Sequence, residues 1–101
     1  MKALMVCSGG MSSTIVVKAL RQEAEKQGFD LEIDAVGTGE VEDELSNVDY
    51  DVLLVAPQVK HLIKRFEEYA KNTNTKLMLI EPTGYTPFGA AKTFETLKTY
   101  Q

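Results

Sequence analysis

Tryptophan is absent from this sequence, and Cys7 is the single cysteine among its 101 residues. One cysteine excludes an internal disulfide, a Cys-x-x-Cys redox pair and a zinc site built from cysteines. We also expect no secretory signal, because the apolar run after Lys2 is shorter than the roughly 7–15 residues such a signal needs. A cytoplasmic protein is therefore expected, with a thiol that either packs in the core or reacts.

Basic residues and long apolar runs are also scarce. The chain has 11 Lys and Arg against 15 Asp and Glu, a formal net charge of -4. This balance argues against nucleic-acid binding, which depends on clustered Lys and Arg. The longest apolar runs, Ala3–Cys7 and Val52–Ala56, have five residues each, whereas a membrane span needs about 20. We therefore expect one domain over residues 1–101, with no direct membrane insertion.

The hydrophobic pattern alternates between the period of strands and the period of helices. Strands are expected at Lys2–Cys7, Leu31–Val36, Asp51–Ala56 and Lys76–Ile80. Helices are expected from Ser12 or Ser13 to Gln27, around Val41–Leu45, from Val59 to Ala70, and after Thr86. Thr86 is expected to cap the last helix, with Pro87 at its first position.

This alternation predicts an α/β fold, a parallel sheet with helices on both faces. The second strand alternates apolar and polar residues and is placed at an edge, which gives four strands in the order 2-1-3-4. The result is a flavodoxin-like or low-molecular-weight-phosphatase-like three-layer sandwich. Its switch point lies at the carboxyl ends of strands one and three, where open sheets bind ligands. Cys7–Gly10 and Ala56–Gln58 meet there.

The segment from Cys7 to Thr14 joins the first strand to a helix N-terminus and has the composition of an anion site. Backbone N–H groups at a helix start bind anions, and Gly9 and Gly10 let the backbone curl around one. The rest of the loop comprises Ser8, Met11, Ser12, Ser13 and Thr14. A helix N-terminus favours the thiolate form of a nearby cysteine, so this loop suits covalent phosphoryl transfer. The alternative is that Cys7 only packs at the strand end and the glycines form a tight turn.

Two further residues, Gln58 and Tyr85, are expected at the same end of the sheet and are candidates for a second layer around the phosphate. Tyr85 covers the phosphate site or packs under the last helix, and Phe88 is expected to pack there. The single histidine, His61, is expected on the surface. No metal site is predicted.

Two motifs carry a family resemblance. The first is a strand that ends in Cys7 and continues as Ser-Gly-Gly-Met-Ser-Ser; the second is Leu-Val-Ala-Pro-Gln-Val at residues 54–59. The chain resembles the enzyme IIB component of the lactose/cellobiose branch of the bacterial phosphoenolpyruvate-dependent sugar phosphotransferase system, of the cellobiose or diacetylchitobiose type. The resemblance covers nearly the whole chain.

The resemblance implies a phosphoryl carrier that needs no cofactor. Cys7 would accept a phosphoryl group from a phosphohistidine of the IIA partner, with Ser8 to Thr14 as its phosphate loop. It would pass the group to a sugar, a β-glucoside disaccharide such as cellobiose, held by the membrane permease IIC. The carrier would then be a bacterial cytoplasmic enzyme component that meets the inner face of the membrane only through IIC.

Two alternatives remain open. Low-molecular-weight tyrosine phosphatases have a similar loop with the pattern Cys-x5-Arg, but here the residue six after Cys7 is Ser13. Losing that arginine removes a strong clamp on the transition-state charge. A non-catalytic flavodoxin-like binding module is the other alternative. A receiver domain is disfavoured, since strands one and three end in Cys7 and Ala56 rather than in acidic residues.

Overall fold

The computed structural model describes residues 1–8 and 11–101, and for residues 11–13 only the backbone. Strands and helices alternate along the chain as the hydrophobic pattern predicts. The strands are β1 (Lys2–Cys7), β2 (Glu32–Gly37), β3 (Val52–Val55) and β4 (Lys76–Leu79). The α-helices are α1 (Met11–Lys26), α2 (Val41–Asn47), α3 (Ile63–Asn72) and α4 (Ala90–Lys98). Two 3-10 helices, η1 (Pro57–Leu62) and η2 (Pro82–Gly84), follow β3 and β4.

The strands form one parallel sheet in the order β2-β1-β3-β4, which confirms the predicted α/β fold and the edge position of β2. The register places Cys7 beside Gly37 of β2, and Val6 beside Val55 of β3. The two central strands are apolar and almost fully buried, because helices cover both of their faces.

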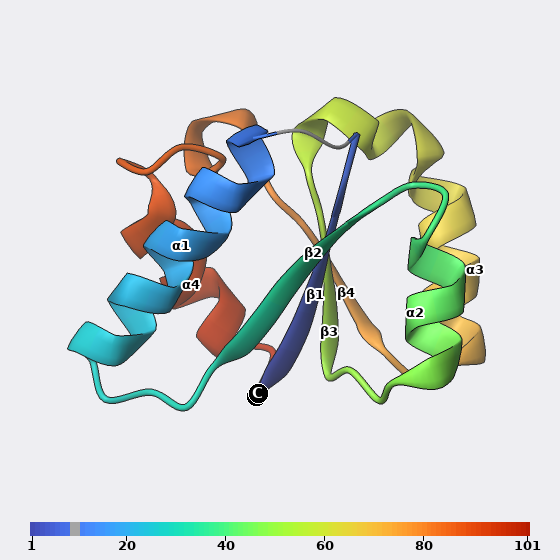
Figure 1. The fold of residues 1–101 in the computed structure, drawn as a ribbon, viewed down its shortest axis with the longest axis horizontal. Coiled ribbons are helices and arrows are strands. Elements are labelled where there is room, and N and C mark those ends of the chain that lie inside the picture. Colours follow the sequence, from blue (N-terminus) through green and yellow to red (C-terminus); the bar gives the residue numbers. More distant parts are fainter. Residues whose placement is uncertain (9–10) are drawn as a thin grey trace.

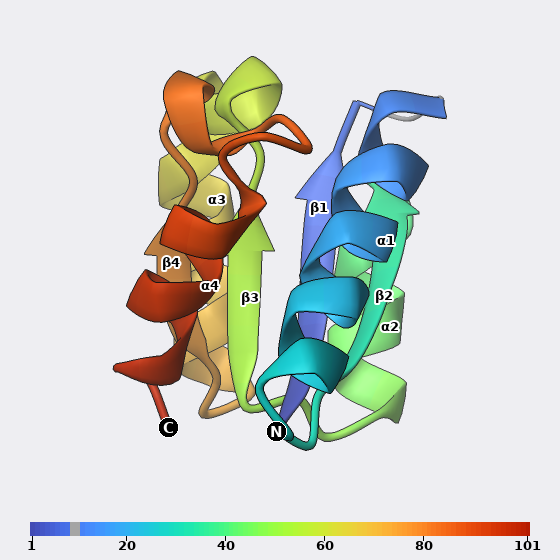
Figure 2. The same ribbon diagram turned by 90° about the vertical axis from the view of Figure 1, so that its left-hand side faces the viewer.

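The helices form two outer layers. Helices α1 and α4 pack together on one face of the sheet, and α2 and α3 pack together on the other (Figures 1 and 2). The rings of Phe29, which follows α1, and Phe94 of α4 pack edge to face, with their centroids 5.3 Å apart. Phe66 of α3 and Phe94 of α4 are fully buried, so each layer supplies one aromatic ring to the core.

The helix expected from Val59 to Ala70 is divided into two parts. Residues 57–62 form η1, which breaks at Val59 with φ -117 and ψ 17, and α3 begins only at Ile63. Pro57 occupies the first position of η1, where its missing N–H costs no hydrogen bond, and the non-helical backbone at Val59 is what separates this first turn from α3. The apolar spacing still holds, since Val59, Phe66 and Ala70 are all buried.

The first and last helices begin at other residues than expected. Helix α1 begins at Met11, so Ser12 and Ser13 lie inside its first turn rather than before it. The prediction that Thr86 caps a helix beginning at Pro87 was wrong, because α4 begins at Ala90. The Thr86 hydroxyl instead accepts a hydrogen bond from the N–H of Gly89 at 3.0 Å and closes a single turn.

The expected packing of Phe88 beneath the last helix was also wrong, because its side chain is 100% exposed. Phe88 lies in the turn that precedes α4 rather than on the inner face of that helix. The inner positions are taken by Ala90, Phe94 and Leu97, which are buried as predicted.

Candidate functional site

The carboxyl ends of β1 and β3 lie side by side, as the topology predicts. The N–H of Ala56, which follows β3, donates to the carbonyl oxygen of Val6 at 3.0 Å. From these two ends the chain departs in opposite directions, through α1 to β2 and through η1 and α3 to β4 (Figure 1). This divergence creates the switch point at which open α/β sheets hold their ligands.

Cys7 is the last residue of β1 and lies at this switch point. Its side chain is 3% exposed, and its Sγ donates to the carbonyl oxygen of Val36 on β2 at 3.7 Å. The thiol therefore lies at the level of the sheet, beside β2. A thiol is a weak donor, so this contact opposes a reaction of the thiol only slightly.

The loop after Cys7 leads directly into the N-terminus of α1. Ser8 and Thr14 have exposed side chains. The predicted phosphate-loop residues Gly9 and Gly10 lie outside the described residues, as do the side chains of Met11, Ser12 and Ser13. Helix α1 has 16 residues and no acidic residue in its first turn. Its N-terminal N–H groups and dipole therefore favour an anion beside the end of β1.

The two candidates for a second layer, Gln58 and Tyr85, lie in the connections that follow β3 and β4. Both connections are at the same end of the sheet as Cys7 (Figure 1). The side chain of Gln58 is exposed on η1, whereas Tyr85 is buried, with 8% exposure. Their predicted positions at this end of the fold are thus observed, and their roles stay predictions.

Arg21, the first arginine after Cys7, is held away from this site. Its guanidinium donates to the carbonyl oxygen of Ile33 and pairs with Asp34 at 3.4 Å. Ile33 lies four residues before Gly37, the neighbour of Cys7, on β2. At about 3.3 Å per strand residue, Arg21 is anchored roughly 13 Å below the thiol. Arg21 therefore does not replace the arginine that a phosphatase loop carries.

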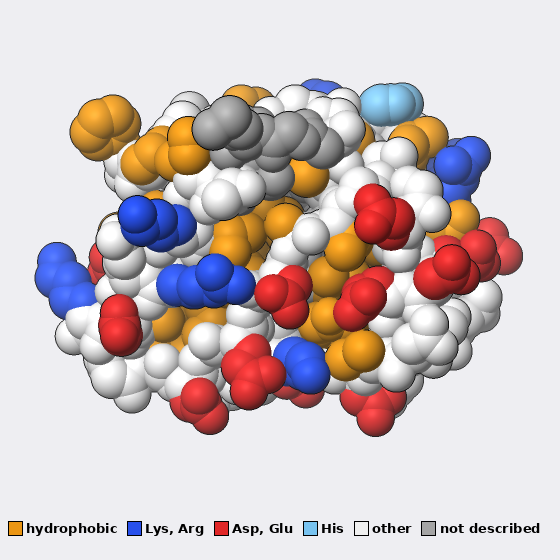
Figure 3. All heavy atoms as spheres, in the orientation of Figure 1, with side chains coloured by type: hydrophobic (Ala, Val, Ile, Leu, Met, Phe, Trp, Pro, Cys, Tyr) orange, Lys and Arg blue, Asp and Glu red, His pale blue; other side chains and the backbone are white. Residues whose placement is uncertain are grey.

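His61 is exposed on η1, as predicted from the sequence. Among the described residues, no cluster of three His, Cys, Asp or Glu side chains could hold a metal ion. Within the same part of the chain, no helix is both long and apolar enough to cross a membrane. Acidic side chains gather over β2 and α2, whereas Lys and Arg gather over α1 (Figure 3).

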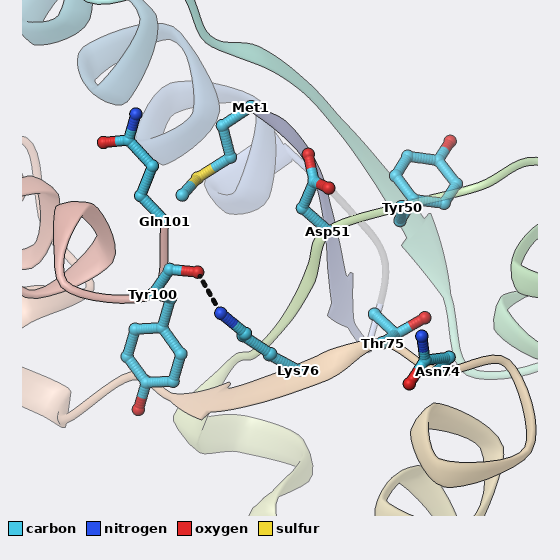
Figure 4. Close-up of a pocket in the computed structure, with 8 residues that line it drawn as sticks. All are labelled: Met1, Tyr50, Asp51, Asn74, Thr75, Lys76, Tyr100 and Gln101. Atoms are coloured by element: carbon cyan, nitrogen blue, oxygen red, sulfur yellow. Dashed lines mark hydrogen bonds between the residues drawn. The ribbon is translucent and has the colours of Figure 1, made fainter.

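A cavity of about 410 Å³ lies at the opposite end of the sheet, where the strands begin. Its lining includes Tyr50, Asp51, Lys76 and Tyr100, and the Lys76 ammonium donates to the Tyr100 carbonyl oxygen at 2.9 Å (Figure 4). This cavity lies a full strand length away from Cys7, so the cavity takes no part in chemistry at the thiol.

Comparison with known protein families shows to which family the chain belongs. The family model described as the lactose/cellobiose-specific IIB subunit of the PTS system matches residues 2–84, from β1 through η2. The chain belongs to this IIB family. The match spans Cys7 and its loop, both central strands, and the connection that holds Gln58.

Individual relatives agree with this assignment. The chain is 28% identical over 94 residues to an oligo-beta-mannoside-specific EIIB component of Bacillus subtilis, covering 93% of this chain and 89% of that protein. A cellobiose-specific IIB component of Borrelia burgdorferi has a solution structure with a TM-score of 0.75 at 25% identity, covering 99% and 90% of the two chains.

The same fold occurs in a protein with a more distant sequence. A lactose-specific IIB domain of Streptococcus pneumoniae has a TM-score of 0.85 at 18% identity, covering 99% of this chain and 96% of that chain. The predicted four-stranded sheet with helices on both faces is therefore the IIB fold.

Proposed function

We propose that this IIB protein carries a phosphoryl group on Cys7 between a phosphohistidine of a IIA protein and a sugar bound by a IIC permease. The observation that carries the proposal is the position of Cys7. It is a thiol at the end of a central strand, at the switch point, directly before the N-terminus of α1.

The chemistry requires two displacements at phosphorus. In the first, the Cys7 thiolate attacks the phosphorus atom, the S–P bond forms, and the N–P bond to the histidine breaks. The imidazole nitrogen keeps the electron pair of that bond. In the second, a sugar hydroxyl attacks the same phosphorus, the S–P bond breaks, the Cys7 sulfur keeps the electron pair as a thiolate, and the hydroxyl proton passes to water. Backbone N–H groups at the start of α1 are suited to neutralise the oxygens in both steps.

The lack of an arginine clamp fits a carrier better than a phosphatase. A carrier has to keep its phosphocysteine from hydrolysis until the acceptor arrives. A guanidinium at the position of Ser13 would stabilise the charge of the hydrolytic transition state. Arg21 is anchored on β2 instead, with its hydrogen bond to Ile33.

For the sugar, we propose a β-linked oligosaccharide. The resemblance to cellobiose-type IIB proteins favours a β-glucoside such as cellobiose, and the relative named for oligo-beta-mannosides adds β-mannosides as a class to test. The IIC partner holds the sugar in this scheme, so the permease decides between the two.

The direct test is phosphorylation of the purified chain. Incubation with phosphoenolpyruvate, enzyme I, the phosphocarrier protein and a IIA protein of the same family should add one acid-sensitive phosphoryl group to the Cys7 peptide, measured by mass spectrometry. Cys7→Ser replaces only sulfur by oxygen and should abolish the adduct and sugar phosphorylation. An unmodified Cys7 peptide beside a fully phosphorylated IIA protein would contradict the proposal.

A further inference from the structure

An exposed aromatic side chain lies at the same end of the molecule as Cys7. Phe88 is 100% exposed, whereas the other two large apolar side chains on the described surface, Ile15 and Leu79, are about half exposed at 49% and 45%. Leaving a whole phenyl ring in water forgoes the favourable free energy of burying it. A ring in this position is available to anchor a partner protein, and aromatic side chains are enriched among the residues that carry most of the binding energy of interfaces.

The segment that carries Phe88 is closely packed against α4. The buried Thr93 hydroxyl donates to the carbonyl oxygen of Gly84 at 2.9 Å, and the N–H of Gly89 donates to Thr86. A Cβ atom on Gly84 would collide with the Thr93 hydroxyl, and one on Gly89 would collide with the Thr83 carbonyl oxygen. These contacts therefore hold the turn on both sides of Phe88.

The position of this segment links it to the candidate site. It follows β4 and lies with η1 and the first turn of α1 at the carboxyl end of the sheet (Figure 1). In the second view, the connection between η2 and α4 reaches toward the first turns of α1 (Figure 2). A protein that approaches Cys7 from this end would meet Phe88 on one side.

Positive charge lies on the other side of the site. Lys60, Lys64 and Arg65, which we call the basic surface, are exposed on η1 and the first turn of α3. Residues 52–66 contain no acidic residue, although the whole chain has a net charge of -4. Across the described chain, no ion pair involves these three side chains. The connections after β2 and β4 add Glu40 and Glu81 at this end, and Glu67 and Glu68 follow in the next turn of α3, so the positive charge is confined to η1 and the first turn of α3.

We propose that Phe88 and the basic surface form the docking surface for the phosphoryl donor, a protein that brings a phosphohistidine within an acidic rim. The inference rests on the proposed function of Cys7. Charge favours the IIA donor over the IIC permease as the partner of this surface. The donor arrives with an anionic phosphoryl group, whereas the sugar held by the permease is neutral. Phe88 supplies an apolar anchor, and the basic surface raises the rate of encounter with the anionic donor.

The test compares matched variants of the whole chain in phosphoryl transfer from a phosphorylated IIA protein of the family. At donor concentrations below saturation, Phe88→Ala should lower the transfer rate about tenfold, as loss of an interface anchor does. Leu79→Ala, the control for an exposed apolar side chain on β4, should change the rate less than twofold. Both variants should reach full phosphorylation at high donor concentration, since neither residue contacts the reacting atoms.

A second pair of variants tests the contribution of the basic surface. Lys64→Glu reverses a charge in the first turn of α3, and Lys71→Glu reverses one in its last turn, about 10 Å further along the axis. Lys64→Glu should lower the transfer rate several-fold at low salt and reduce its dependence on ionic strength, because steering by charge is screened by salt. Lys71→Glu should leave both nearly unchanged.

The outcomes separate this inference from the proposed function. If Cys7 of the unmodified chain accepts no phosphoryl group, the proposed function fails and the docking surface fails with it. If Cys7 is phosphorylated but Phe88→Ala behaves like Leu79→Ala, the inference alone is wrong. It is also wrong if transfer from IIA is normal and only sugar phosphorylation by IIC-containing membranes is slowed, since the surface then serves the acceptor. Because Phe88 is fully exposed, unchanged thermal unfolding of Phe88→Ala should accompany a supporting result.

Discussion

Replacing Gly89 by alanine should destabilise the protein through one close backbone approach. A Cβ on this residue would collide with the carbonyl oxygen of Thr83 and lie 2.9 Å from the Cα of Gly84. Both neighbours are backbone atoms, so no side-chain rotation can relieve the overlap. Gly89 itself has φ -92 and ψ -1, a conformation that any residue adopts. The cost is therefore steric, and overpacking of this kind costs about 1–3 kcal/mol of unfolding free energy.

Two other glycines provide controls. A Cβ atom on Gly39 would have no neighbour within 4 Å, so Gly39→Ala should change the unfolding free energy by less than about 0.5 kcal/mol. Gly28 has equal space but φ +68, so Gly28→Ala should cost about 1 kcal/mol from backbone strain alone. The three variants thus separate steric overlap, backbone strain and the intrinsic effect of a methyl group.

The assay is urea unfolding followed by circular dichroism, together with thermal unfolding. In a chain of this size each kcal/mol corresponds to a shift of about 4–8 °C in Tm. Gly89→Ala should also slow phosphoryl transfer from IIA, because relief of the overlap displaces the segment that carries Phe88. Equal stability of Gly89→Ala and Gly39→Ala would refute the argument that this turn has no room for a Cβ atom.

Three further changes test other parts of the structure. Thr93→Val removes the buried donor to Gly84 and should cost about 1–3 kcal/mol in urea unfolding, whereas Thr96→Val on the exposed face should cost much less. Burial, and hydrogen bonding to Glu44, raise the pKa of the Tyr50 phenol above its ordinary value. The folded state therefore holds this proton more tightly than the unfolded state, so the contribution of Tyr50 to stability should be constant below about pH 10 and be lost progressively above it. A phenolate absorbance titration should show this late step, and Tyr50→Phe should remove it. Ser13→Arg restores the Cys-x5-Arg spacing and should shorten the lifetime of phosphocysteine, measured by loss of the adduct; an unchanged lifetime would count against our account of the missing arginine.

Local pattern was sufficient for most of the architecture. Apolar runs of strand length and apolar residues at helical spacing depend on neighbours within one element, so they predict β1, β3 and the buried face of α3 correctly. The alternating residues of the second strand placed it at an edge, and that choice determined the strand order that the structure confirms. The position of Cys7 at the switch point follows from that order.

Boundaries next to prolines were less predictable. The sequence spacing extends one helical pattern from Val59 to Ala70, but the backbone at Val59 is non-helical, so a 3-10 turn that starts at Pro57 precedes α3. At the last helix, Thr86 and Pro87 have the composition of a helix start, yet they form a separate turn.

The sequence by itself determined the layered α/β fold, the family and the location of the thiol, because each depends on periodicity or on residues adjacent in the chain. Only the tertiary structure decided that Phe88 faces solvent and that Arg21 is anchored along β2. The first depends on the contact of Gly89 with Thr83 and Gly84, and the second on a carbonyl group of a neighbouring strand. The Arg21 contact joins a helix to a strand whose separation is set only when the layers pack, and the turn at Gly84 is held by the buried Thr93 of α4, so no local pattern encodes either arrangement.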